Sequence, residues 1–291
     1  MKKNPTPFLL RLVQWGFPKL ESVFPFLSNR LFITLFFTPL RYKTPYKEIE
    51  TRASAEKFRL ALRDGKKIQC YAWGEGPIVL FVHGWAGRGT QFRNFFPEIV
   101  NAGYRAIAVD GPAHGLSTGR RTDLDGFMLM LFEIEKSVGK IDSIITHSFG
   151  GVATLYSVMK GLKIRSLVNI ASPAIGDEII DQYLRAMNGS PKTGDFFRKY
   201  VFKRTGKPFY EFSAEYFIQH VPDSINLLLI HDRGDIEVPI THPNRLVELR
   251  PQTHLLITEG LGHYRILKDQ EVIRQAVTFL KDLRLNSVNE G

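Results

Sequence analysis

The sequence predicts an α/β protein in which a mostly parallel sheet is covered by helices on both faces. Strand-like and helix-like segments alternate from about residue 66 to residue 173, which is the pattern of a parallel sheet built from crossover units. Several short apolar runs end in loops rich in glycine, histidine, serine and aspartate, among them the loops at His83, Asp110 and Ser148. Because ligands bind at the carboxyl ends of parallel strands, we expect a functional site in these loops.

The 291-residue chain begins with a segment, residues 1–45, that we expect to form an amphipathic helical extension. Its apolar residues recur at helical spacing, and Pro18 and Pro25 are expected to break or kink the pattern. Ser28 is expected to cap a second helix that ends before Pro39. The apolar face must be buried, either on the body of the protein or on a membrane surface. The basic residues that favour a membrane are Lys2, Lys3, Arg11, Lys19 and Arg30.

Residues 46–173 and 224–291 are predicted to form the sheet with its flanking helices. The expected strands are 67–73, 78–82, 105–109, 143–146 and 166–170, followed by 225–231 and 255–258. The expected helices lie near 90–101, 124–138 and 151–160. Residues 174–223 interrupt the alternation with helical patterns near 177–187, 195–203 and 208–220, in which aromatic residues are dense. We expect some of these aromatic side chains to form a local core and others to line an apolar pocket.

The segment from Thr146 to Gly151 carries the strongest chemical signal. A serine, Ser148, stands between a buried strand and a helix and is followed two residues later by a glycine, which is the arrangement of a nucleophile elbow. Such a turn exposes the serine oxygen and places the N–H of the next residue, Phe149, at a helix N-terminus that favours negative charge. A serine hydroxyl is barely ionised at neutral pH, so it needs a neighbouring base.

Four further motifs follow strands in the same way, and with Ser148 they make the chain resemble the α/β-hydrolase family. They begin at His83, Asp110, Asp232 and Gly260. The resemblance runs from about residue 66 to residue 283, apart from the insertion at 174–223, and it implies that this insertion is a helical cap. The chain departs from the family pattern at one position, where Thr146 stands in place of the usual glycine.

The resemblance implies a catalytic triad of Ser148, Asp235 and His263, in the chain order that this fold requires. His263 stands after the last expected strand, where the family has its base, and the other seven histidines occupy positions less suited to that role. Asp235 precedes a Val-Pro pair by three residues, as the family's acid does, and Asp232 is the competing candidate. The main-chain N–H groups of Trp85 and Phe149 are expected to form the oxyanion hole.

The predicted activity is that of a serine hydrolase that cleaves a carboxylic ester, with an apolar group on the substrate. A thioesterase, a carbon–carbon bond hydrolase and an acyltransferase use the same triad and remain alternatives. A haloalkane dehalogenase is disfavoured because that chemistry needs a carboxylate where Ser148 stands. A non-catalytic binding protein on the same fold is an alternative of another class.

Composition restricts the remaining classes. The formal charge is +10, but the sequence has no nucleic-acid recognition motif and no dense basic run, so we expect no nucleic-acid partner. The single cysteine excludes an internal disulfide, and no Cys or His cluster has metal-ligand spacing. We therefore expect neither a cofactor nor a metal. The N-terminus lacks the long apolar run and cleavage site of a signal peptide, which favours a cytoplasmic protein with membrane association through residues 1–45 as an option.

Overall fold

The computed structural model describes residues 8–289 and divides the chain into two compact units. The sheet unit comprises residues 39–174 and 214–289, and the helical unit comprises residues 8–38 and 175–213. Lys2 and Lys3, which contribute to the expected membrane-binding charge, lie outside the described residues.

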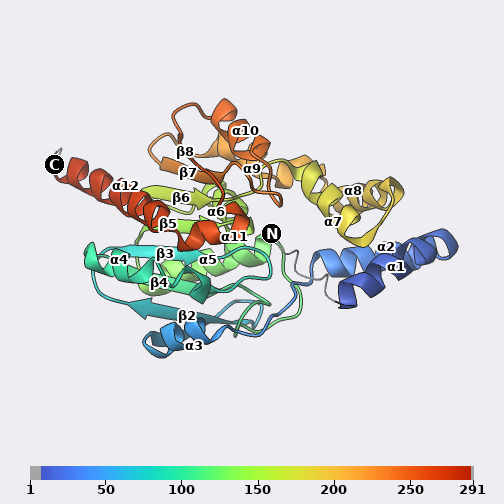
Figure 1. Cartoon of the computed structure of the whole chain (residues 1–291), viewed down its shortest axis with the longest axis horizontal. Coiled ribbons are helices and arrows are strands. Elements are labelled where there is room, and N and C mark those ends of the chain that lie inside the picture. The colour runs from blue at the N-terminus through green and yellow to red at the C-terminus, as the bar shows by residue number, and fades with distance from the viewer. Residues whose placement is uncertain (1–7, 290–291) are drawn as a thin grey trace. The chain divides into compact units, whose positions relative to one another are not determined.

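The sheet unit is built on one sheet of eight strands in the order β1-β2-β4-β3-β5-β6-β7-β8 (Figure 1). The strands β3 to β8 run parallel to one another, and β2 joins β4 antiparallel, with β1 antiparallel at the edge. The predicted α/β class is therefore confirmed. The strands are β1 (Glu56–Ala61), β2 (Lys67–Trp73), β3 (Ile78–Val82), β4 (Arg105–Asp110), β5 (Ile141–His147), β6 (Ser166–Ile170), β7 (Asn226–Asp232) and β8 (His254–Thr258).

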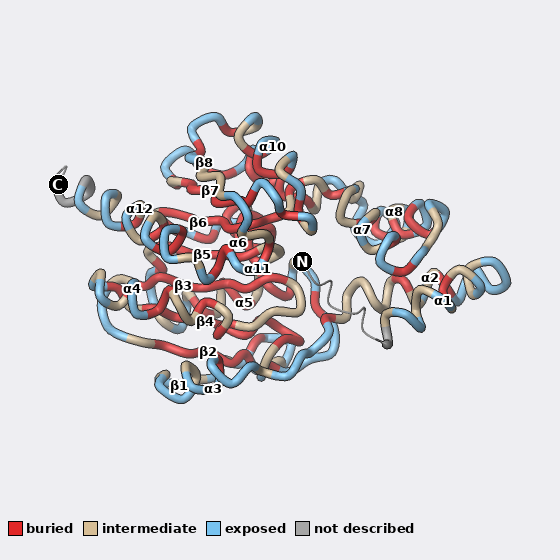
Figure 2. Tube along the Cα trace, viewed as in Figure 1, coloured by how far each residue is buried: buried red, intermediate tan, exposed pale blue. Residues whose placement is uncertain are grey.

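Helices cover both faces of this sheet, and the strands β3 and β6 are buried throughout (Figures 1 and 2). A single apolar cluster joins one face to α4 and α12, with Phe81, Phe96 and Ile273 among its fully or almost fully buried members. The helices of this unit are α3 (Tyr46–Ala53), α4 (Phe96–Asn101), α5 (Leu124–Val138), α6 (Phe149–Met159), α9 (Ala214–Phe217), α10 (Thr241–Leu249), α11 (Gly262–Arg265) and α12 (Gln270–Asn289). Asp123 caps α5 by accepting a hydrogen bond from the Gly126 N–H, as an N-cap aspartate does.

Two predicted helices are wrong in extent. The helix expected near 90–101 is a 3₁₀ turn, Gly89–Phe92, followed by the separate helix α4. Pro97 explains the restart, because proline has no N–H to continue a helix but fits a helix's first turn. The helix expected near 208–220 is three short pieces, namely a 3₁₀ turn at Phe209–Phe212, α9 and a 3₁₀ turn at Ile218–His220.

The helical unit consists of α1 (Phe8–Val23), α2 (Pro25–Phe36), α7 (Gly176–Met187) and α8 (Pro191–Thr205). Within it α1 packs on α2 and α7, and α2 packs on α8. Its core is aromatic and aliphatic, comprising Phe17, Phe32, Ile180, Leu184, Met187, Phe197 and Val201. The N-terminal extension and the inserted helices thus bury their apolar faces against each other.

The expected break at Pro25 and the expected end before Pro39 are confirmed, because α1 ends at Val23 and α2 ends at Phe36, whereas Pro18 and Ser28 were misread. Helix α1 continues through Pro18, so the expected break does not occur. A proline leaves the carbonyl four residues earlier without its helical donor, and that carbonyl, Gln14 O, accepts a hydrogen bond from Asn188 Nδ2 at 3.2 Å. Pro25 begins α2 in the first turn, so Ser28 is not an N-cap but lies inside the helix, where its Oγ donates to Pro25 O.

Glu21 makes a second polar connection within the helical unit. Its carboxylate accepts hydrogen bonds from Ser190 N, Ser190 Oγ and Thr193 Oγ1 at the start of α8. Burial raises the pKa of Glu21, but these hydrogen bonds outweigh it and hold the pKa below its ordinary value. A carboxylate at a helix N-terminus is also favoured by the helix dipole, so α1 supplies the cap of α8.

Candidate active site

Ser148 lies at the sharp turn between β5 and α6. Its φ of 52° is in the left-handed region, which is uncommon for a residue with a side chain and is found where surrounding structure holds it. The Ser148 N–H donates to Ile170 O of β6 at 2.9 Å. Gly150 is required at the start of α6, because a Cβ there would come within 2.2 Å of Val82 O. The helix therefore approaches β3 closely and directs the serine to the carboxyl edge of the sheet.

Thr146, the departure from the family pattern, is accommodated inside β5. Its side chain is fully buried, and its Oγ1 donates to Asn169 Oδ1 of β6 at 2.9 Å. The threonine therefore adds a side-chain hydrogen bond between β5 and β6 beside the elbow. It removes no group that the proposed chemistry needs.

Asp235 and His263 are brought together by the loops after β7 and β8. Asp235 Oδ2 accepts a hydrogen bond from His263 Nδ1 at 2.7 Å. Asp235 Oδ1 accepts two more, from Glu237 N and Val238 N, at 2.8 and 2.9 Å. Desolvation raises the pKa of Asp235, but the hydrogen bond and charge of His263 and these amides lower it below its ordinary value. The carboxylate is therefore ionised at neutral pH and fixes the histidine with its proton on Nδ1.

The competing acid, Asp232, is engaged elsewhere. Its Oδ1 accepts from Gly234 N at 3.0 Å, and its Oδ2 accepts from Thr258 Oγ1 and Leu261 N at 2.9 Å each. These bonds connect the end of β7 to the loop after β8. Asp232 therefore shapes the loop that carries His263, while Asp235 contacts the imidazole itself.

His147 connects the elbow to the histidine loop. Its buried ring hydrogen-bonds through Nε2 to His263 O at 2.8 Å and through Nδ1 to Gln91 Nε2 at 3.2 Å. Desolvation lowers the pKa of His147 to about 3, so the ring is neutral and donates to the carbonyl. Within residues 8–289, Ser148 Oγ and His263 Nε2 do not form a hydrogen bond with each other. Such bonds are often long in unliganded enzymes and shorten when substrate binds.

The loop after β3 passes directly against the serine. A Cβ on Gly84 would lie 2.7 Å from Ser148 Cβ. His114 Nε2 accepts from Ala86 N at 3.0 Å, and Ala86 has a φ of 57°. The Trp85 ring meets the Phe149 ring edge to face, with centroids 5.3 Å apart. Phe149 supplies the first N–H of α6, which has no partner within the helix, so both expected oxyanion donors belong to segments beside Ser148.

His83 and His114 support these loops and do not act as bases. Within each ring Nδ1 faces a main-chain carbonyl, and His83 Nε2 accepts from Gly111 N at 2.8 Å. Desolvation lowers their pKa values to about 4 and about 3. Both rings are therefore neutral at pH 7, and the sequence had already made them less suited than His263 to be the base.

Sequence reasoning missed two residues beside the histidine, Glu237 and Tyr264. Glu237 Oε2 accepts a hydrogen bond from Tyr264 Oη at 3.0 Å and lies 3.9 Å from His263 Nε2. Their position in the sequence could have indicated that they lie near the site, because Glu237 follows Asp235 by two residues and Tyr264 follows His263 directly.

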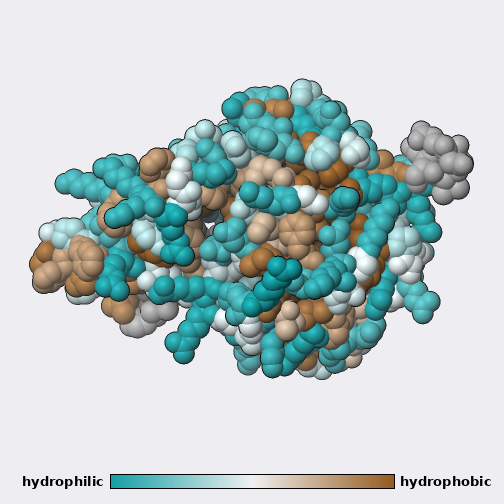
Figure 3. All heavy atoms as spheres, turned by 180° about the vertical axis from the view of Figure 1, so that it is seen from behind, coloured by the Kyte–Doolittle hydropathy of each residue, from teal (hydrophilic) through white to brown (hydrophobic). Residues whose placement is uncertain are grey.

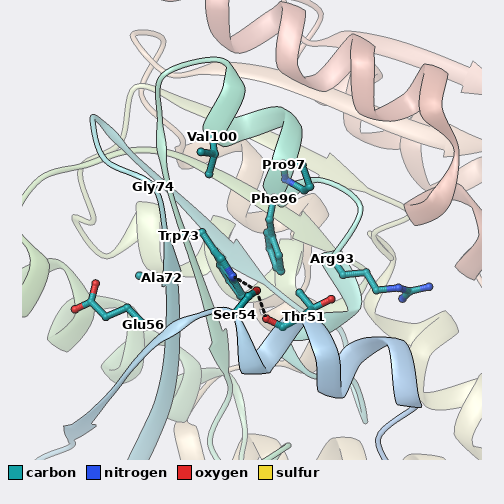
Figure 4. A pocket seen from close by; sticks show the side chains of 10 residues that line it. All are labelled: Thr51, Ser54, Glu56, Ala72, Trp73, Gly74, Arg93, Phe96, Pro97 and Val100. Carbon is teal, nitrogen blue, oxygen red and sulfur yellow. Dashed lines mark hydrogen bonds between the residues drawn. The ribbon is translucent and has the colours of Figure 1, made fainter.

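A surface hollow of about 570 Å³ lies elsewhere in the sheet unit (Figure 4). Its wall includes Trp73 stacked on Phe96, with ring centroids 4.1 Å apart. Trp73 pairs with Ala106 near the start of β4, so the hollow is toward the amino ends of the parallel strands, whereas Ser148 is at the carboxyl ends. The lining residues are Thr51, Ser54, Glu56, Ala72, Trp73, Gly74, Arg93, Phe96, Pro97 and Val100. An apolar pocket above Ser148, lined by aromatic residues of 174–223, stays a prediction.

Two kinds of feature are absent from the part of the chain that the structure describes. No three His, Cys, Asp or Glu side chains in residues 8–289 are grouped so that they could hold a metal ion. No helix in that range is long and apolar enough to cross a membrane.

Comparison with known proteins places the chain in a family. Residues 79–275 match the model of the alpha/beta hydrolase family. The chain is 37% identical to a non-heme chloroperoxidase of Kitasatospora aureofaciens over 92 residues, which are 31% of this chain and 34% of that protein. It is 30% identical to a serine hydrolase-like protein of Danio rerio over 150 residues, 47% of this chain and 44% of that protein. The matches thus span about a third to under half of these relatives' lengths.

Solved structures share the fold at low sequence identity. An esterase of Pyrococcus furiosus is 18% identical with a TM-score of 0.64, covering 85% of this chain and 96% of its own. A putative lipase of Acinetobacter baumannii is 18% identical with a TM-score of 0.65, covering 85% and 99%. The family match over most of the chain, on a sheet of this topology, shows that the protein belongs to the alpha/beta hydrolase family.

Proposed function

We propose that the protein is a serine hydrolase that cleaves carboxylic esters through an acyl-enzyme intermediate. The observation that carries the proposal is the 2.7 Å hydrogen bond between Asp235 and His263, formed in the loop that His147 connects to the elbow of Ser148. A serine at an elbow, a histidine and a buried carboxylate are the three parts of a hydrolytic triad. A protein that only bound a ligand would have no need of all three.

In the proposed reaction, Ser148 Oγ attacks the acyl carbon while His263 Nε2 takes its proton. The carbonyl oxygen becomes an oxyanion that accepts hydrogen bonds from the N–H groups of Trp85 and Phe149. Asp235 stabilises the imidazolium through Nδ1. When the tetrahedral intermediate collapses, the proton passes from His263 to the leaving alcohol. Water, deprotonated by the same histidine, then attacks the acyl-enzyme and releases the acid.

The substrate we propose is a small ester with an apolar group. Structures that share the fold include an esterase and a protein described as a putative lipase, which supports an ester as the substrate. Thioester cleavage, carbon–carbon bond hydrolysis and acyl transfer follow the same steps with another leaving group or acceptor and remain the alternatives.

The experiment is hydrolysis of p-nitrophenyl esters, from acetate to palmitate, by the wild type and by Ser148→Ala. Loss of the nucleophile of a triad lowers kcat by about 10⁶-fold, so the variant is expected to be inactive while it unfolds at an unchanged temperature. The chain length with the highest kcat/KM measures the acyl pocket. Equal rates in the two proteins would reject the mechanism, and ligand binding without turnover in the wild type would favour the binding-protein alternative.

A second proposal concerns a membrane partner of the helical unit. Apolar side chains gather at the surface over α1 and α2 (Figure 3), and Trp15 and Phe26 are 64% and 66% exposed. Lys19 Nζ stands 3.5 Å from the centre of the Trp15 ring, and the Arg30 guanidinium 5.6 Å from that of Phe26. Aromatic side chains beside cations are the composition of a membrane-interface helix. We therefore propose that this face binds a bilayer surface containing anionic lipids.

The charge of the helical unit supports an anionic partner. Residues 1–38 and 175–213 hold twelve of the 39 Lys and Arg residues but only six of the 29 Asp and Glu residues. The test is flotation of the full chain with phosphatidylcholine vesicles, with and without phosphatidylserine. Flotation that needs phosphatidylserine, weakens with salt and is lost in the double variant Trp15→Ser/Phe26→Ser would support the proposal. The control is Tyr46→Ser, which changes an exposed aromatic of the sheet unit; flotation unaffected by the double variant would refute the assigned face.

A further inference from the structure

Glu237 is held in place by the proposed acid, Asp235, and by Tyr264, the residue that follows His263. Its main-chain N–H donates to Asp235 Oδ1 at 2.8 Å, so the backbone of Glu237 is fixed by the acid. Its carboxylate accepts from Tyr264 Oη at 3.0 Å, and Tyr264 directly follows His263 in α11. Because its main chain and its carboxylate are both restrained, the Glu237 side chain loses little further rotamer freedom when a substrate binds.

The carboxylate faces the nitrogen at which the proposed reaction occurs. Glu237 Oε2 lies 3.9 Å from His263 Nε2, which is beyond a hydrogen bond but well within the range of electrostatic interaction. His263 Nδ1, by contrast, is bound to Asp235. Both side chains are partly exposed, with exposed fractions of 40% for the Glu237 side chain and 59% for Tyr264. A molecule that approaches Nε2 therefore comes close to the Glu237 carboxylate.

Among the described residues, the other carboxylate and the histidines beside His263 do not supply a comparable exposed charge. Asp235 is buried and its oxygens accept hydrogen bonds from His263 and two amides. His147 and His231 are buried, and desolvation lowers the pKa of each, so both are neutral at pH 7. Glu237 is therefore the accessible carboxylate in this group of neighbours.

We propose that Glu237 determines the charge selectivity of the reaction, and this inference rests on the function proposed above. The leaving alcohol must approach His263 Nε2 to receive its proton, so its substituents come near the Glu237 carboxylate. An alcohol that carries a cationic group is favoured there, and one that carries a carboxylate is disfavoured. The substrate class is thus an ester of a cationic or neutral alcohol.

The size of the effect follows from Coulomb's law. Two unit charges about 4 Å apart in full water screening change an equilibrium by about fivefold, and lower local dielectric increases the factor. The substituent of a leaving alcohol lies further from the Glu237 carboxylate than Nε2 does, which lowers the factor. We therefore expect a preference of about threefold to fivefold.

The experiment compares esters that share a butyryl group and differ in the charge of the alcohol. They are butyrylcholine, its uncharged isostere 3,3-dimethylbutyl butyrate, and the anionic 4-butyryloxybutyrate. The measured quantity is the ratio of kcat/KM for the charged ester to kcat/KM for the neutral one within each protein, so that a general change in activity cancels. In Glu237→Gln, the cation preference is expected to fall, and the discrimination against the anion to shrink, by about threefold to fivefold each.

Two further variants make the result specific. Glu98→Gln makes the same charge change at an exposed position on α4 and is expected to keep the wild-type ratios. Tyr264→Phe removes the hydrogen bond that holds the carboxylate and is expected to reduce the preference partially. Unchanged ratios in Glu237→Gln would overturn the inference alone. If no ester is cleaved in a way that depends on Ser148, the proposed function fails and the inference fails with it.

Discussion

Replacement of Asp235 by asparagine tests the proposed base through its tautomer. One oxygen of Asp235 accepts the N–H groups of Glu237 and Val238, and the other accepts from His263 Nδ1. In Asp235→Asn, the amide oxygen is expected to stay with the two main-chain donors, which directs the NH₂ group toward the imidazole. Nδ1 must then accept a hydrogen bond, so the imidazole proton moves to Nε2. A histidine protonated at Nε2 is unable to take the proton of Ser148.

The expected loss in kcat is about 10⁴-fold, the value for this substitution in a Ser-His-Asp triad, or about 5 kcal/mol of transition-state stabilisation. The assay is steady-state hydrolysis of the best p-nitrophenyl ester, with circular dichroism to show that the variant is folded. A loss of less than tenfold in the folded variant would refute the assignment of Asp235 as the acid.

Asp232→Asn is the matched control, because it makes the same chemical change at the competing acid. Asp232 accepts from Gly234 N, Thr258 Oγ1 and Leu261 N, so an NH₂ group must face at least one donor. Leaving such a buried group unsatisfied costs about 1–3 kcal/mol. We therefore expect a lower unfolding temperature, with kcat reduced by less than tenfold below that temperature. A loss as large as that of Asp235→Asn would mean that the two roles are reversed or shared.

Three further outcomes are expected. His83 and His147 are buried, with pKa values lowered to about 4 and about 3, so the unfolded chain binds more protons between pH 6.5 and these values. Urea denaturation is therefore expected to show an unfolding free energy that decreases as the pH is lowered below 6.5, by up to about 1.4 kcal/mol per pH unit for each histidine. A flat profile from pH 6.5 to 4.5 would contradict this. Gly84→Ala places a Cβ 2.7 Å from Ser148 Cβ, so p-nitrophenyl ester hydrolysis should fall at least tenfold, and an unchanged rate would exclude the close approach. Phe32→Ala removes a fully buried ring from the helical unit, which is expected to cost about 3–5 kcal/mol in thermal unfolding of that unit, whereas a loss below 1 kcal/mol would argue against that core.

The sequence predicted the fold best where the same few residues define both the end of a strand and the chemistry of the loop that follows it. The expected strands at 67–73, 78–82 and 166–170 match β2, β3 and β6 in full, because a short apolar run between polar loops in an α/β chain has few other ways to be buried. The edge strand β1 was not predicted. Its exposed and half-buried residues alternate and give a weaker apolar pattern, and its identity as a strand depends on pairing with β2.

Side-chain partners across long sequence separations were the least predictable part of the candidate site. The elbow at Ser148 follows from local residues, whereas the contact of Glu237 with Tyr264 joins the loop after β7 to α11, 27 residues away in the sequence. The preference for Asp235 over Asp232 came from family resemblance, since both stand after the same strand and carry the same chemistry. Only the loop conformation determines which carboxylate contacts the imidazole, and that conformation depends on the hydrogen bonds that Asp232 itself makes.

The contacts that the extension makes within the helical unit have a consequence for experiments on membranes. Local propensity assigns a helix-breaking cost to Pro18, but it does not include Asn188, which satisfies the carbonyl that the proline leaves free. Likewise, Glu21 caps α8 from a different helix, and Phe17 and Phe32 form one core with Ile180. Deletion of residues 1–45 would therefore remove Phe17 and Phe32 from a shared core and expose the apolar faces of α7 and α8, and faces exposed in this way are expected to bind vesicles nonspecifically. Exposed substitutions such as Trp15→Ser leave that core intact, and for this reason they separate membrane binding from unfolding where a truncation does not.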